Sequence, residues 1–236
     1  MARKTKAELA AMAKTFAKRT RDRNYRFRKL TKPQQRVRIA KDVIQYLESG
    51  KLVAARAGYL NVPDAYEKYF SSGEVMADLE YELEEAENGD MSDDSYTDTQ
   101  SQAEMKQVSK ELNTQMKLSL TPLHEVFEKT PSCTVCGIGA AFVAAVLRAD
   151  DTVVGDLDGR EDAMQMRHYL GTWFDLPQLG MIEAAFEQQG SFAKAQGSSI
   201  ISAHRSWQFG EAIYDPEDRM IAIMKNIVDN NGTFVP

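Results

Sequence analysis

The sequence predicts a mainly α-helical fold, with an α+β fold that contains one small sheet as the alternative. Apolar residues recur at helical spacing in several segments, and Ser, Thr or Asp followed by Pro or Glu precedes most of these segments. Residues 51–60 are the best strand candidate, and Gly58 interrupts them, so any sheet is expected to be small. Of the 236 residues, 43% are hydrophobic and 27% are charged, which is ordinary for a globular protein.

The first part of the chain is predicted to hold a basic arm and a helical segment. Residues 1–30 form the basic N-terminal arm, which includes a weakly amphipathic helix. Residues 31–87 form a helical segment with a short strand. Its first helix is expected to begin after Thr31, because Pro33 falls in the first turn, and to end near Gly50.

The rest of the chain is predicted to be an acidic flexible linker, 88–100, followed by a helical core, 101–236, packed with 31–87 as one domain. Its central helix is expected at 133–148, where CTVCGIGAAFVAAVLR is apolar and rich in small residues that let another backbone come close. Capping patterns predict further helix starts at Ser101, Thr121, Asp158, Asp175 and Asp215.

Charge is divided unevenly along the chain. Residues 1–42 contain fifteen Lys or Arg and three acidic residues, a net charge of +12, so the other 194 residues carry −18 of the total of −6. No apolar run approaches the ~18 residues of a membrane span, and the first residues lack the apolar stretch of a secretory signal. We therefore expect a cytoplasmic protein without a membrane span. Its two cysteines are too few for a disulfide framework.

Four stretches carry a resemblance to other proteins: RIAKDV (38–43), CTVCGIGA (133–140), IEAAFE (182–187) and RMIAIMKNI (219–227). Together they are similar to a group of proteins encoded by tailed bacteriophages. The resemblance leaves out the basic arm and the acidic linker. It implies expression in the cytoplasm of a bacterial host and an accessory role, such as action on host machinery or host defence. It attaches no activity and no catalytic residue.

The basic arm is a candidate nucleic-acid-binding site. Cations that neutralise phosphates alternate there with rings that stack on bases: Arg19, Arg21, Arg23, Tyr25, Arg26, Phe27, Arg28 and Lys29. The alternative is a solvated arm that docks on the protein's own acidic stretch, 74–98, a stretch that could itself imitate nucleic-acid charge.

The CxxC pair of Cys133 and Cys136 is a candidate catalytic or metal site. With His124, His168 or His204 it could form a zinc site or a thiol-dependent active site. No histidine stands at a recognised finger spacing from the pair, however, and two reduced cysteines buried at the start of a helix are the preferred interpretation. We expect no cofactor, with zinc as the alternative.

The third candidate is a partner-binding segment near the C-terminus. It contains residue types enriched at interface hot spots: His204, Arg205, Trp207, Phe209 and Tyr214. The preferred interpretation, however, is a loop that packs these side chains against the core.

These observations predict a non-catalytic accessory interaction protein that binds a host protein or a protein–nucleic-acid complex. A direct nucleic-acid binder that uses residues 1–30 is one alternative, and a thiol- or zinc-dependent enzyme that uses the CxxC pair is another. The small-residue face of 133–148 fits two kinds of contact equally. One is the interface of a homo-oligomer, and the other is a contact within a single chain.

Overall fold

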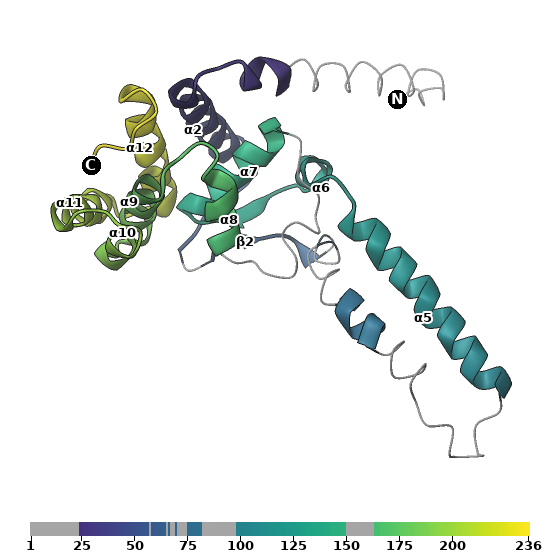
Figure 1. The fold of residues 1–236 in the computed structure, drawn as a ribbon. Coiled ribbons are helices and arrows are strands. Elements are labelled where there is room, and N and C mark those ends of the chain that lie inside the picture. Colours follow the sequence, from purple (N-terminus) through teal and green to yellow (C-terminus); the bar gives the residue numbers. More distant parts are fainter. Residues whose placement is uncertain are drawn as a thin grey trace.

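Helix α7, Gly137–Ala149, lies at the centre of the fold in the computed structural model, which describes residues 24–56, 58–64, 66, 69, 75–81, 98–149 and 163–236 (Figure 1). All 13 residues of α7 are buried. Its packing partners are α2 (Lys32–Glu48), α6 (Leu123–Lys129), α8 (Ala163–Leu170) and α9 (Leu176–Glu187). Glycine allows close packing, because a Cβ atom at Gly139 would lie 1.6 Å from the Tyr59 carbonyl oxygen. The predicted central helix with a small-residue face is confirmed.

A small sheet lies beside the start of α7. Its strands are β1 (Leu52–Ala54), β2 (Leu60–Asn61) and β3 (Cys133–Val135). The order is β1-β3-β2, with β1 parallel and β2 antiparallel to β3. The prediction that Cys133–Val135 begins the central helix is therefore wrong: hydrogen bonding to strands on both sides keeps these residues extended, and the helix starts at Gly137. The mainly α fold with one small sheet is confirmed.

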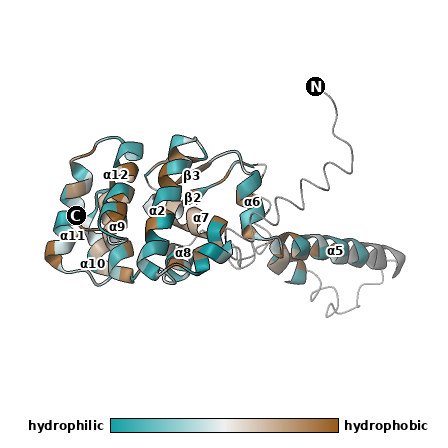
Figure 2. Ribbon diagram, turned by 90° about the horizontal axis from the view of Figure 1, so that it is seen from above, coloured by the Kyte–Doolittle hydropathy of each residue, from teal (hydrophilic) through white to brown (hydrophobic). Residues whose placement is uncertain are grey.

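A second group of helices packs against α2 and α9. It consists of α10 (Gly190–Ala195), α11 (Ile200–Glu211) and α12 (Pro216–Asp229). Helix α12 packs against both α2 and α9, whereas α10 and α11 pack against α9 and each other. In Figure 2 hydrophobic and hydrophilic residues alternate along these helices. The prediction of a loop over 204–214 is wrong for most of that segment, which belongs to α11.

Local capping explains where several helices begin. Asp175 accepts a hydrogen bond from the Gln178 amide at 2.8 Å, and Asp215 accepts from the Glu217 and Asp218 amides at 2.8 and 3.0 Å. Both starts were predicted, as was the start of α2 after Thr31, whose amide donates to Gln34 Oε1 at 3.0 Å.

Helix α5, Asp98–Ser119, extends away from the helical body (Figures 1 and 2). The prediction of a helix start at Ser101 is wrong, because Ser101 lies inside α5. At Thr121 the prediction is closer, since α6 begins at Leu123 with Pro122 as its cap. Residues 88–97 of the predicted linker and the predicted start at Asp158 lie outside the described residues.

Candidate functional site

A pocket between α10 and α11 is the candidate functional site. Its volume is about 490 Å³, and its lining is mostly apolar. The lining residues are Gln188, Gly190, Ser191, Lys194, Ile200, Ala203, His204 and Trp207. A concave, mostly apolar surface with a few polar groups at its edge is the usual form of a binding site.

The start of α11 places three of the lining side chains on one face. Ser199 caps the helix, because its hydroxyl accepts a hydrogen bond from the Ser202 amide at 3.1 Å. Ile200, His204 and Trp207 then follow at positions i, i+4 and i+7 of the helix, which share a face. The rings of His204 and Trp207 contact each other, with centroids 5.4 Å apart.

Close packing holds α11 against α9, whereas the rim of the pocket is exposed. A Cβ atom at Gly210 would lie 1.7 Å from the Ala185 carbonyl oxygen, so α11 approaches α9 at backbone distance. By contrast, Ile200 is 72% exposed and the adjacent Ile201 is 66% exposed. The exposed Ile200 and the neighbouring Trp207, which both line the pocket, form an apolar patch that a partner could cover.

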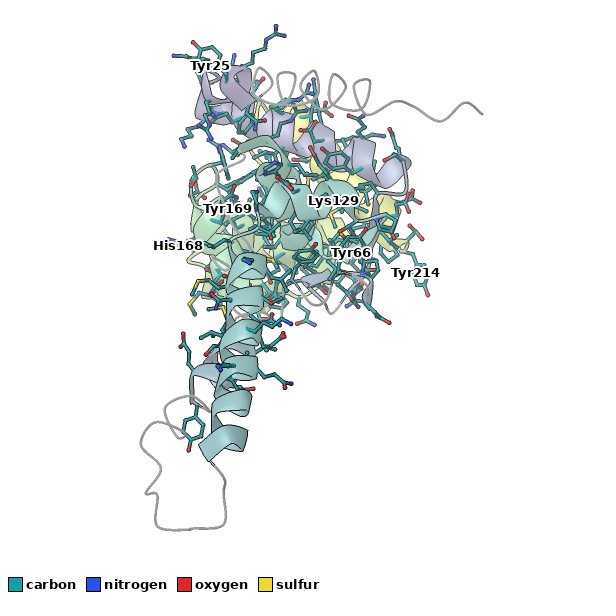
Figure 3. The ribbon with its side chains drawn as sticks, turned by 90° about the vertical axis from the view of Figure 1, so that its right-hand side faces the viewer. Tyr25, Tyr66, Lys129, His168, Tyr169 and Tyr214 are labelled. Carbon is teal, nitrogen blue, oxygen red and sulfur yellow. The ribbon has the colours of Figure 1, made fainter. Side chains whose placement is uncertain are left out.

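The five predicted partner-binding residues are dispersed by the structure. His204 and Trp207 line the pocket, and Arg205 is exposed on the same helix. Phe209 instead packs edge-on against the buried Phe234, with ring centroids 5.3 Å apart. Tyr214 lies beyond the end of α11 and is 96% exposed. Its labelled side chain points outward at the edge of the molecule in Figure 3.

Sequence reasoning missed Ser191, Lys194 and Ile200. The pair Ser199 and Ser202 was the signal that could have found Ile200, because a serine cap predicts that a helix begins there and that Ile200 shares a face with His204.

Both cysteines are buried. Cys133 lies in β3 and Cys136 lies directly before α7, each with 1% of its surface exposed. Burial raises the pKa of the Cys133 thiol to about 11 and that of the Cys136 thiol to about 12. Amide hydrogen bonds from Gly139 and Ile138 act in the opposite direction on Cys136 but are outweighed by burial. Both thiols are therefore protonated at neutral pH in this state.

The predicted histidines are on separate elements. His124 lies on α6, His168 on α8 and His204 on α11. Within the described ranges, no group of three or more His, Cys, Asp or Glu side chains could hold a metal ion.

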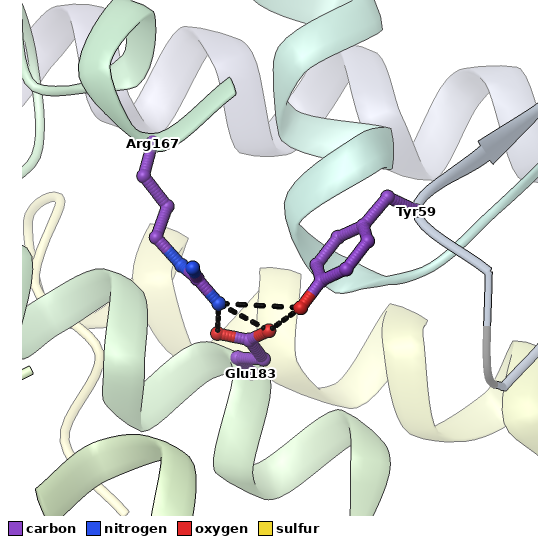
Figure 4. Close-up of polar contacts among 3 residues, drawn as sticks. All are labelled: Tyr59, Arg167 and Glu183. Carbon is purple, nitrogen blue, oxygen red and sulfur yellow. Dashed lines mark hydrogen bonds and ion pairs between the residues drawn. The ribbon is translucent and has the colours of Figure 1, made fainter. Parts of the chain in front are cut away.

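Three polar side chains from distant segments meet beside α7 (Figure 4). Arg167 of α8 donates through one terminal nitrogen to both carboxylate oxygens of Glu183 at 2.6 Å. The Tyr59 hydroxyl donates to Glu183 Oε1, also at 2.6 Å. Because burial and this hydrogen bond favour the neutral phenol, the pKa of Tyr59 lies above its ordinary value. The cluster ties the loop before β2 to α8 and α9.

Sequence reasoning missed this cluster as well. Glu183 was the available signal, because it interrupts the apolar stretch of α9 and is 1% exposed, and a buried carboxylate requires partners. Nothing in the sequence names Tyr59 and Arg167 as those partners.

The predicted nucleic-acid-binding residues are divided between surface and core. Tyr25, Arg26, Arg28 and Lys29 are exposed, and the Lys29 ammonium lies 5.3 Å from the centre of the Tyr25 ring. Phe27 is buried instead and packs against Trp173, with ring centroids 6.0 Å apart. It is therefore not exposed for stacking on a base. Arg19, Arg21 and Arg23 lie outside the described residues.

Comparisons with protein-family models, with curated proteins and with solved structures gave no match to this chain. In the part of the chain that the structure describes, no helix combines the length and the apolar character that crossing a membrane requires. The function must therefore be argued from the arrangement of the residues themselves.

Proposed function

We propose that this chain is an accessory interaction protein of a tailed bacteriophage, which acts in the host cytoplasm by binding a host protein through the α10–α11 pocket. The observation that carries the proposal is the mostly apolar pocket of about 490 Å³ beside the exposed Ile200. Pockets of about 300–1,000 Å³ are typical of binding sites for compact ligands, and this one has room for apolar side chains of a partner.

The chemistry of the rim suggests which partner segment would fit. Trp207 and Ile200 offer an apolar contact, and Lys194 adds a cation at the edge. A helix or loop with one large apolar side chain and a neighbouring carboxylate complements these groups. Burial of one Ile or Leu side chain contributes about 1.5–3 kcal/mol, enough to change affinity by about tenfold or more.

The resemblance to phage proteins supports the rest of the proposal. An accessory phage protein meets its targets in the host, where components of host machinery or host defence are the expected partners. A host protein that is bound to nucleic acid fits the proposal equally, because the basic and acidic parts of the chain carry opposite charges.

A thiol- or zinc-dependent enzyme is less well supported. The thiolate is the nucleophile and the metal ligand, whereas burial raises the pKa of both Cys133 and Cys136 and favours the protonated thiols.

The test compares Ile200→Asp with Met164→Asp, in which an equally exposed apolar residue on α8 receives the same charge. The two full-length variants and the wild type are used as baits in nuclease-treated host lysate, and bound proteins are quantified by mass spectrometry. We expect one stoichiometric partner that the wild type and Met164→Asp retain and Ile200→Asp loses. Equal capture by all three baits would contradict a role for the pocket, and capture of no protein would contradict the proposed function.

A further inference from the structure

The exposed surface of residues 25–41 is strongly basic and lies apart from the α10–α11 pocket, since α9 and α12 are between them. We call this surface the basic face. Its exposed cations are Arg26, Arg28, Lys29, Lys32, Arg38 and Lys41. The sequence has no acidic residue from Asn24 to Lys41. The basic face is therefore not neutralised by its own segment.

The first acidic residue after the basic face, Asp42, does not reduce the positive charge of that face. Asp42 is buried, and Arg148 donates to both of its carboxylate oxygens. Arg38 adds a longer ion pair at 3.4 Å and remains about half exposed. One carboxylate shared by two guanidinium groups leaves a net charge of +1, so this cluster still contributes a positive potential.

The shape of the basic face is set by α2. Ile39, Val43 and Leu47 bury one side of the helix. The opposite side carries polar residues, all exposed, at helical spacing: Gln34, Arg38, Lys41, Gln45 and Glu48, the last of which ends the helix beyond the basic face. From Lys32 to Lys41 the helix rises about 14 Å, a distance over which one strand of a duplex presents about four phosphates.

We propose that the basic face binds the phosphates of double-stranded DNA, with α2 lying along the duplex. Single strands are bound in grooves where several rings stack on bases. Here the surface is the outside of a helix, Phe27 is buried, and Tyr25 is the ring that remains exposed (Figure 3). A lipid surface would require apolar residues along the outer side of α2, and those positions are polar. The major groove of B-DNA admits a helix, whereas that of duplex RNA is too narrow and deep.

This binding is independent of the proposed function, because it uses other residues on another side of the body. A chain that carries both surfaces could hold a host protein at DNA. If duplex DNA does not bind to the basic face, the proposed binding of a host protein at the α10–α11 pocket is unaffected, and the reverse also holds.

The test measures fluorescence anisotropy of labelled duplex DNA, single-stranded DNA and duplex RNA of equal length with the full chain over a series of salt concentrations. Lys29→Ala and Lys41→Ala are compared with Lys110→Ala, which removes an exposed cation from α5. Circular dichroism melting verifies that each variant is folded.

We expect duplex DNA to bind most tightly, with an affinity that falls as salt rises. Each basic-face substitution should weaken binding about fivefold to tenfold near 0.1 M salt and reduce the slope of log affinity against log salt by about one. Lys110→Ala should match the wild type. The proposal is overturned if duplex DNA does not bind at low salt, or if both basic-face variants bind like the wild type. It is also overturned if single-stranded DNA or duplex RNA binds more tightly than duplex DNA.

Discussion

Asp42 of α2 and Arg148 of α7 form a buried ion pair that joins the two helices. Arg148 donates through its terminal nitrogen to Asp42 Oδ1 at 2.7 Å and through Nε to Oδ2. The side chains are only 2% and 10% exposed, so each charge depends on the other for solvation.

Replacement of Asp42 should therefore destabilise the fold strongly. Asp42→Ala leaves the Arg148 guanidinium buried without its counter-charge, which costs about 3–5 kcal/mol. Arg38→Ala is the control, because Arg38 contacts the same carboxylate from the surface and should cost at most about 1 kcal/mol. Urea unfolding gives both values, and equal losses for the two variants would show that the buried pair has no special role.

A methyl group at Gly139 should disturb the contact between α7 and the loop before β2. The Cβ atom of Gly139→Ala would overlap the Tyr59 carbonyl oxygen, which is backbone and cannot rotate away. We expect a loss of about 1–3 kcal/mol in the free energy of unfolding. Gly58→Ala is the matched control, because nothing lies within 4 Å of a Cβ atom there. An unchanged midpoint for Gly139→Ala would mean that the loop moves without cost.

The buried thiols should make stability fall at alkaline pH. In the unfolded chain a thiol loses its proton near pH 9, whereas the folded protein holds Cys133 protonated to about pH 11 and Cys136 to about pH 12. Between these values the folded state binds more protons than the unfolded state, so stability decreases as pH rises, by up to about 1.4 kcal/mol per pH unit for each thiol.

Urea unfolding at pH 8 and pH 10.5 measures this loss, and Cys133→Ala should reduce it. A disulfide reagent that releases a coloured product on reaction with a thiol provides an independent measurement at pH 8. Both thiols should react slowly with it in the native protein and rapidly in urea. Rapid reaction of the native protein would contradict the buried state of the cysteines.

Much of the helical framework could be predicted because helix ends are local. Asp175 and Asp215 cap helices through amides two or three residues away, so the sequence around each start contains the whole interaction. The central helix could equally be predicted from the sequence, since 133–148 combines strong hydrophobicity with small residues. The error there was at Cys133–Val135, whose extended conformation depends on pairing with Leu52–Ala54 and Leu60–Asn61.

The candidate site was predicted only in part for the same reason. His204 and Trp207 were identified by residue type, but the pocket also requires α10 to pack beside α11, which no local pattern states. The cluster of Tyr59, Arg167 and Glu183 shows most clearly what local sequence patterns cannot predict, because each residue comes from a different segment.

The sequence by itself determined the mainly helical class, several helix ends and the position of the positive charge, since each depends on neighbouring residues or on composition. Only the tertiary structure decided which side chains reach solvent. Phe27 and Tyr25 are two residues apart in one aromatic and basic segment, yet Trp173 covers the first and the second stays exposed. Whether a side chain is covered depends on packing between segments far apart in the chain. There the burial of apolar surface, and not local preference, determines the free energy.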